Sequence, residues 1–153
     1  MLTKLRLLKK HFLLFTGTLF FAVSLLATAQ SSDSIRGDEA INEALQAAQA
    51  WLALIDNQQY AQSWDETADF FKSKVSKEKW LTVLNASQQK LGKVLSRSVF
   101  TRQYRTTMPG APAGEYVIIE YRMSFEKDNS AVEKISMVLD SDNTWRVVGY
   151  LIK

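Results

Sequence analysis

The chain has 153 residues, with 19 lysines and arginines against 16 aspartates and glutamates, one histidine and no cysteine. The absence of cysteine excludes disulfides, thiol nucleophiles and cysteine-ligated metal sites. Basic and acidic residues are interspersed, whereas a surface that binds phosphate needs clustered lysine and arginine. We therefore expect no nucleic acid among the partners.

The first 29 residues are typical of a secretory signal peptide. Basic residues within the first ten positions precede an apolar run over residues 12–26, and the small-residue pattern Ala27-Thr28-Ala29 follows it. This run is shorter than the roughly 20 residues that cross a bilayer. We predict cleavage after Ala29, no stable membrane anchor afterwards, and a periplasmic or secreted protein.

Cleavage at this point would remove His11, the only histidine, and leave 15 basic against 16 acidic residues, a net charge of about −1. Without imidazole or thiol, Ser-His and Cys-His mechanisms and His- or Cys-ligated zinc are excluded. Acid–base chemistry near neutral pH would need a carboxylate, a lysine or a tyrosine. The sequence favours a protein without enzymatic activity, and we expect no cofactor and no metal.

A flexible lead-in over residues 30–37 is predicted from its polar, serine-rich composition, followed by a single domain over residues 38–153. Apolar residues at three- and four-residue spacing predict three helices. The first begins with Asp38 as its cap, and the third is capped by Ser76 and ends before Gly92. The predicted helices cover residues 38–56, 60–74 and 76–91.

From Val94 onward the apolar period changes to two, which predicts four strands. In the last strand Gly149 would permit a bend or bulge. Helices followed by antiparallel strands indicate an α+β domain with the three helices packed on one face of a curved four-stranded sheet. The predicted strands cover residues 94–106, 115–126, 131–139 and 144–152.

Two charged residues interrupt apolar strand faces. Arg97 falls between Leu95 and Val99, and Glu133 shares its face with Ile135. One interpretation is that they reach water at strand ends or form a structural ion pair. The other is that both line a polar spot in an apolar cavity. On the second interpretation the candidate ligand-binding residues are Trp64, Arg97, Tyr121 and Glu133.

An enzymatic alternative uses Asp65 or Glu133 as a base. Asp65 follows Trp64 at the edge of an apolar helix stripe, and a carboxylate desolvated against an indole would suit an isomerase or hydrolase. A tyrosine or Arg97 would then polarise the substrate. The competing interpretation is a solvated helix-edge aspartate.

The outer face of the predicted sheet is unusually apolar for a solvated surface. Monomers rarely expose such a patch, so it predicts a homodimer or a protein partner on this face. The residues assigned to it are Tyr116, Ile118, Val148, Tyr150 and Ile152.

Several motifs together resemble the domain of unknown function 4019 (DUF4019) family of exported bacterial proteins. The resemblance covers the chain roughly from Ala44 to the end, and Gln88-Gln89-Lys90 stands where we expect Arg-x-Pro. It implies the periplasm or cell envelope, no established activity, and a nuclear-transport-factor-two-like (cystatin-like) α+β cone, a fold that hosts ligand binders and small isomerases. We therefore expect a module that binds a small apolar ligand or an envelope protein. The motifs are Tyr60-Ala61-Gln62-Ser63-Trp64-Asp65, Leu91-Gly92-Lys93-Val94, the loop over residues 109–116, and Trp145-Arg146-Val147-Val148-Gly149-Tyr150.

Overall fold

The computed structural model describes the backbone from Leu19 and the side chains from Ile35 onward. The chain divides into two compact units, residues 1–35 and 36–153. In the first unit the described part is helical backbone. Residues 1–18 of the predicted signal peptide lie outside the described residues, and cleavage after Ala29 stays a prediction. Among the described residues, no helix has the length and apolar character to span a bilayer.

The first helix, α1, spans Leu19–Asp56 and therefore continues through residues 30–37, where we predicted a flexible lead-in. Asp38 lies inside this helix and does not cap it, so that prediction is wrong. At Gly37, which is buried, an added Cβ would lie 3.5 Å from the ring of Tyr104. Glycine has a low helix propensity, and this close packing of α1 against β1 stabilises the helix at Gly37.

The second predicted helix is divided in two, so the structure has four helices where we predicted three. The division has a physical cause in the residues between the two parts. The Thr67 hydroxyl donates to the Trp64 carbonyl at 2.8 Å, and the Ala68 N–H donates to the Val147 carbonyl of the last strand at 2.9 Å. These bonds replace the helical bonds at this point. The helices after α1 are α2 (Tyr60–Asp65), α3 (Asp69–Lys72) and α4 (Lys77–Leu91).

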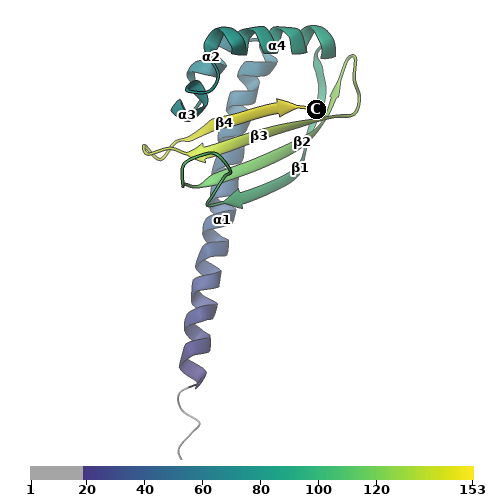
Figure 1. The fold of residues 1–153 in the computed structure, drawn as a ribbon. Helices are drawn as coiled ribbons and strands as arrows, with labels where there is room; N and C mark the ends of the chain where they lie inside the picture. The colour runs from purple at the N-terminus through teal and green to yellow at the C-terminus, as the bar shows by residue number, and fades with distance from the viewer. Residues whose placement is uncertain (1–18) are drawn as a thin grey trace, which may run out of the picture. The chain divides into compact units, whose positions relative to one another are not determined.

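The four predicted strands are confirmed to within one residue at each end. They form one antiparallel sheet in the order β1-β2-β3-β4, so each strand pairs with the next along the chain. Figure 1 shows α4 passing across one end of this sheet and leading directly into β1. The α+β class with helices before the sheet is thereby confirmed. The strands are β1 (Val94–Arg105), β2 (Tyr116–Phe125), β3 (Ala131–Leu139) and β4 (Trp145–Ile152).

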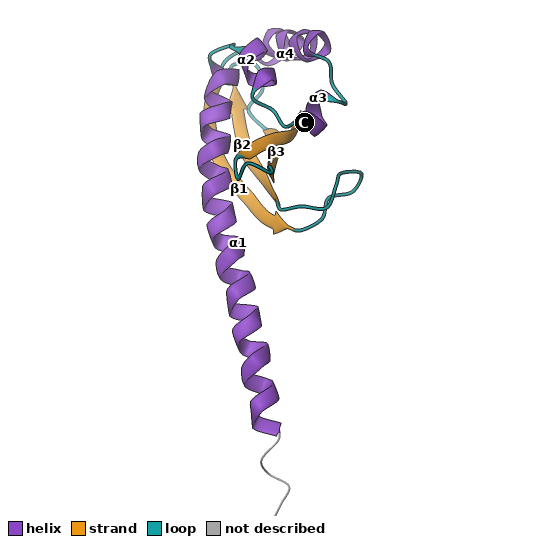
Figure 2. Ribbon diagram, turned by 90° about the vertical axis from the view of Figure 1, so that its left-hand side faces the viewer, coloured by secondary structure: helices purple, strands orange, loops and turns teal. Residues whose placement is uncertain are grey.

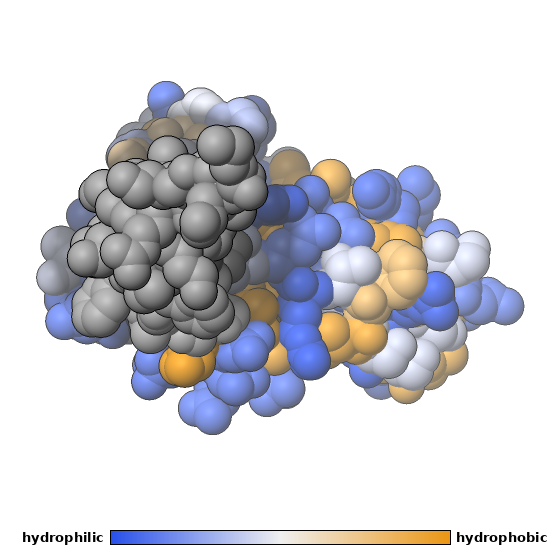
Figure 3. Space-filling view, turned by 90° about the horizontal axis from the view of Figure 1, so that it is seen from below, coloured by the Kyte–Doolittle hydropathy of each residue, from blue (hydrophilic) through white to orange (hydrophobic). Residues whose placement is uncertain are grey.

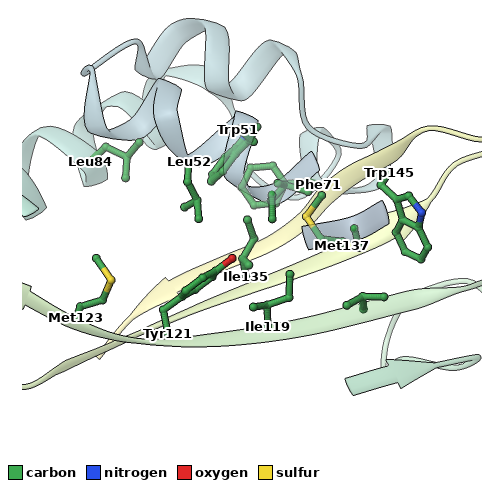
Figure 4. Packing of buried hydrophobic residues seen from close by; sticks show 14 of the residues in the cluster. Trp51, Leu52, Phe71, Leu84, Ile119, Tyr121, Met123, Ile135, Met137 and Trp145 are labelled. Atoms are coloured by element: carbon green, nitrogen blue, oxygen red, sulfur yellow. The ribbon is translucent and has the colours of Figure 1, made fainter. Parts of the chain in front are cut away.

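The core lies between α1 and one face of the sheet (Figure 2). The face of α1 that is completely buried consists of Ala40, Ala44, Ala48 and Leu52. Alanines at four-residue spacing allow the helix backbone to approach the strands closely. Above the sheet the space is filled by larger side chains, among them Trp51, Ile119 and Met137 (Figure 4).

The opposite face of the sheet is not the open apolar patch that we predicted. Tyr116 and Val148 are buried there in a small second cluster with Ala68. The pairing of β3 with β4 shifts by one residue between Ser136 and Met137. As a result, Tyr150 pairs with Ile135 and packs against the core, as does Ile152. The residues on which the predicted homodimer was based are thus largely packed within the domain, and the homodimer itself stays a prediction.

Strand β1 lies at the edge of the sheet, and Leu95, Val99 and Phe100 on it are exposed. Its pairing with β2 is interrupted at Leu95 and at Phe100. The guanidinium carbon of Arg122 lies 4.1 Å from the centre of the Phe100 ring. Bulges and charged residues of this kind keep a free edge from pairing with other chains. On the face seen from below, hydrophobic and hydrophilic residues are intermixed (Figure 3).

Gly92 connects α4 to β1 with φ 77° and ψ −158°, a conformation that only glycine adopts readily. We expect Gly92→Ala to lower the free energy of unfolding by roughly 1–3 kcal/mol from backbone strain. The loss should be larger still because the new Cβ would lie 2.9 Å from Glu126 Cβ, which a change of side-chain rotamer does not move. Urea unfolding followed by tryptophan fluorescence measures this loss. The matched control is Gly110→Ala, where φ is 76° but nothing lies within 4 Å. Equal losses in the two variants would contradict the steric part of the argument.

Candidate functional site

A pocket of about 280 Å³ opens where the last turns of α1 and α4 meet the ends of β1, β3 and β4. We call it the Arg97 pocket. Its apolar wall comprises Ile55, Leu84, Leu91, Val94, Phe125 and Ile152. We use the term polar wall for five of its polar residues, and Gln58, Ser87, Gln88 and Lys93 line the pocket as well. The polar wall consists of Asp56, Tyr60, Arg97, Glu133 and Tyr150. The pocket thus combines an apolar lining with a few converging polar groups, as small-molecule sites do.

Arg97 and Glu133 meet in this wall, 36 residues apart in sequence. Arg97 Nε donates to Glu133 Oε2 at 2.7 Å, and Arg97 Nη2 lies 3.3 Å from Glu133 Oε1. The Glu133 side chain is only 1% exposed and that of Arg97 is 17% exposed. The two residues therefore form an ion pair, and this pair lines the Arg97 pocket; that they bind a ligand stays a prediction.

The bulge in β1 explains how Arg97 reaches this position. Val94 pairs with Phe125 and Arg97 with Met123, so both point to the core side although they are three residues apart. The extra residue is Leu95, which is exposed and does not share the face of Arg97, contrary to the prediction. Because β1 is an edge strand, the guanidinium lies between buried Glu133 and solvent.

Two further residues of the polar wall form hydrogen bonds with this pair. Asp56, the last residue of α1, accepts hydrogen bonds from Arg97 Nη1 at 2.6 Å and Nη2 at 2.8 Å. The Tyr150 hydroxyl donates to Glu133 Oε1 at 2.7 Å. Such bidentate, charge-assisted bonds fix the guanidinium plane and hold the wall in one geometry.

The electrostatics of the wall follow from this arrangement. Burial alone lowers the pKa of the Arg97 guanidinium, but its hydrogen bonds to Asp56 and the charge of Glu133 raise that pKa above its usual value. Burial, together with the negative charge of Glu133, raises the pKa of Tyr150 well above 10.0. The guanidinium is therefore permanently charged, and the phenol stays a hydrogen-bond donor.

The raised pKa of Tyr150 predicts a specific loss of stability in alkali. A buried phenol that resists ionisation favours folding below the unfolded pKa, and this contribution is lost as pH rises beyond 10.0. We expect the free energy of unfolding to fall with increasing pH in this range, and Tyr150→Phe to reduce the slope. Urea unfolding at a series of alkaline pH values measures both slopes. Identical slopes for the variant and the wild type would contradict the assignment.

Glu133 is poorly placed to act as a catalytic base. Its two oxygens accept hydrogen bonds from Arg97 and from Tyr150, so the carboxylate is engaged in holding the wall. A general base must instead reach a proton on the substrate. The geometry favours a structural and binding role for Glu133.

Asp65, the other candidate base, lies outside the Arg97 pocket. Its side chain is 55% exposed and pairs with Lys77, whose Nζ lies 2.7 Å from Asp65 Oδ2. It borders a second depression, of about 420 Å³, which is more open to solvent and also includes Trp51, Trp145 and Arg146. The enclosure that would desolvate a carboxylate is missing at Asp65.

The other two predicted binding residues are also outside the pocket lining. The Trp64 indole N–H donates to the Val75 carbonyl at 2.8 Å, and the amino groups of Lys72 and Lys77 lie 5.8 and 5.6 Å from the centre of its ring. Tyr121 is buried in the core, where its hydroxyl points away from β2 (Figure 4). This hydroxyl has no hydrogen-bond partner within the described part of the chain. Of the four predicted residues, the structure places Arg97 and Glu133 together in one pocket.

Sequence reasoning missed Asp56, Tyr60 and Tyr150. Asp56 was interpreted only as the end of a helix, and Tyr150 was assigned to the outer face. Gln88, in the segment that departs from the expected family pattern, lines the pocket as well.

Among the described residues, no group of three or more His, Cys, Asp or Glu side chains is arranged to hold a metal ion.

Comparison with known proteins gives one match. A family model described as "Protein of unknown function (DUF4019)" matches residues 47–150. No curated protein and no solved structure matches the chain. The matched range includes all of the residues that form the polar wall of the pocket.

Proposed function

The chain belongs to the DUF4019 family of proteins of unknown function, and we propose that its second unit is a non-enzymatic module that binds a small ligand in the Arg97 pocket. The observation that carries this proposal is an ion pair between Arg97 and buried Glu133 in the wall of a pocket that is lined in part by apolar side chains. Burying charges is costly unless every group is paired. A fold that keeps such a wall next to an open cavity has the features of a binding site.

The size of the pocket limits the ligand. A cavity of about 150 Å³ holds benzene, and typical ligand pockets begin at roughly 300 Å³. At about 280 Å³, the Arg97 pocket fits a small molecule with a short apolar body and one polar end. The polar end would meet Asp56, Glu133 and Tyr150, and the apolar body would contact Leu84 and Leu91.

The setting in which this binding takes place is also part of the proposal. We infer export to the periplasm or cell envelope after cleavage behind Ala29, from the basic and apolar pattern of residues 1–29. The nuclear-transport-factor-two-like cone implied by the family resemblance agrees with the order of helices and strands. Binding of an envelope protein remains the second role that the sequence suggests.

We do not propose an isomerase or hydrolase. Residues 36–153 contain neither histidine nor cysteine. Glu133 is held by Arg97 and Tyr150, and Asp65 is held by Lys77 in solvent. Neither carboxylate combines enclosure with freedom to accept a proton from a substrate.

The proposal predicts that a small neutral probe enters the pocket. In methyl NMR spectra, 1-hexanol should cause saturable shifts of Leu84, Leu91 and Ile152, which line the cavity. Ser87→Phe places a ring in the pocket from α4 and should weaken the binding of 1-hexanol roughly tenfold or more. A tenfold change corresponds to about 1.4 kcal/mol, and the apolar contact from which the ring excludes the ligand is worth at least that much.

Ala86→Phe is the matched control, because residue 86 is the exposed neighbour of Ser87 on the same helix and does not line the pocket. This variant should bind 1-hexanol as the wild type does. Shifts that are spread over the surface, or equal in Ser87→Phe and wild type, would overturn the proposal.

A further inference from the structure

The charges around the Arg97 pocket point to a particular class of ligand. We infer that the pocket selects a small cationic amphiphile, that is, a primary ammonium group on a short apolar body, over neutral and anionic molecules of the same shape. This inference rests on the proposed function and adds the chemical class of the ligand to it.

The first argument is the surplus of negative charge in the polar wall. Arg97 carries one positive charge, whereas Asp56 and Glu133 carry one negative charge each. Arg97 already donates to both carboxylates through Nε, Nη1 and Nη2. An anion would have to displace one of these carboxylates from the guanidinium. An ammonium group displaces nothing and neutralises the surplus charge.

The second argument is the number of hydrogen-bond acceptors that remain. A carboxylate offers about four lone-pair positions, and Asp56 uses two of them for Arg97. The Asp56 side chain is 34% exposed, so its remaining positions are open to a ligand. An ammonium group has three donors and no acceptor, which matches a wall of carboxylate oxygens.

The third argument is the direction of the helices. The carboxyl ends of α1 and α4, at Asp56 and Leu91, both lie at the pocket. The C-terminus of a helix carries roughly half a negative charge, which favours cations. Aromatic rings in the lining, those of Tyr60, Phe125 and Tyr150, add surfaces that attract a cation.

Lys93 also lines the pocket, and its charge, like that of Arg97, opposes a cation. It is exposed, so water and salt screen its charge more effectively than the charge of Glu133, which is buried. The effect of Lys93 on a bound cation should therefore be smaller than that of Glu133.

The test compares three probes of equal length on the complete chain at neutral pH and low salt: hexylammonium, 1-hexanol and hexanoate. Dissociation constants come from the methyl shifts of Leu84, Leu91 and Ile152. We expect hexylammonium to bind roughly tenfold more tightly than 1-hexanol, because hydrogen bonds between charged groups exceed neutral ones by about 1–1.5 kcal/mol. Hexanoate should bind most weakly, and added salt should reduce the difference.

Two variants connect the preference to the residues. Asp56→Asn removes the surplus charge and should reduce the ratio of hexylammonium to 1-hexanol affinity toward one, whereas Lys93→Gln should keep or increase this ratio.

Hexylammonium binding no tighter than 1-hexanol in the wild type would overturn the inference while leaving the binding pocket itself in place. Failure of all three probes to bind would instead count against the proposed function. If Asp56→Asn does not fold, the wild-type series and Lys93→Gln still decide the question.

Discussion

Replacing Glu133 by leucine should be among the most destabilising substitutions in the domain. The change leaves the Tyr150 hydroxyl without its acceptor and removes one of the two carboxylates that hold Arg97. Breaking a buried pair by removing one partner costs about 3–5 kcal/mol. Because Arg97 is partly exposed and keeps Asp56, we expect a loss at the lower end, about 3 kcal/mol, in urea unfolding at neutral pH.

Two comparisons make this result specific. Glu66→Leu changes an exposed carboxylate and should alter stability by less than about 0.5 kcal/mol. The double variant Arg97→Met with Glu133→Leu should be more stable than Glu133→Leu alone, since replacing both members of a buried pair by apolar residues is close to neutral. A Glu133→Leu protein as stable as the wild type would show that the pair is solvated in solution.

Trp80→Ala should cause a loss of similar or larger size. The Trp80 ring packs against Trp51, Phe71 and Tyr150 at centroid distances of 6.0, 5.3 and 5.7 Å. Its indole N–H donates to the buried hydroxyl of Ser63 at 3.0 Å. Truncating a buried tryptophan creates a large cavity and typically costs about 3–5 kcal/mol.

The control for this prediction is Val83→Ala in the same helix. Val83 is 49% exposed, so little apolar area is lost from the core when it is truncated. We expect a loss of well under about 1 kcal/mol. Differential scanning calorimetry of the two variants measures both losses in one experiment. If the two melting temperatures fell equally, α4 would not pack through Trp80 as described.

The strands could be predicted because apolar residues recur at two-residue spacing, most regularly in β2 and β3, and turn residues separate the segments. Arg97 and Glu133 could be singled out for a related reason, since each breaks an apolar face and had to be paired or to line a cavity. Their pairing follows from the order of strands, which places β1 and β3 on either side of β2. These features are local patterns, and a single sequence contains them.

The remaining features depend on contacts between distant segments. The extra residue in β4 reverses the side to which Tyr150 points, and nothing in the alternation of Val147, Val148 and Gly149 fixes where the shift occurs. Asp56 joins the site only because the end of α1 lies over β1, 41 residues further along the chain. Likewise, Gly37 lies within α1, and its close approach to Tyr104 on β1 joins segments far apart in the chain. Tertiary contacts override local propensity in each case.

The most direct test of the account is native mass spectrometry of the protein purified gently from the cells that produce it. The account predicts that a fraction of the wild-type protein carries a small molecule, and that Ser87→Phe, with the pocket occluded, carries none. Ala86→Phe should retain the same extra mass as the wild type. Bare protein in all three preparations, or the same bound mass on Ser87→Phe, would contradict the claim that the Arg97 pocket is a binding site.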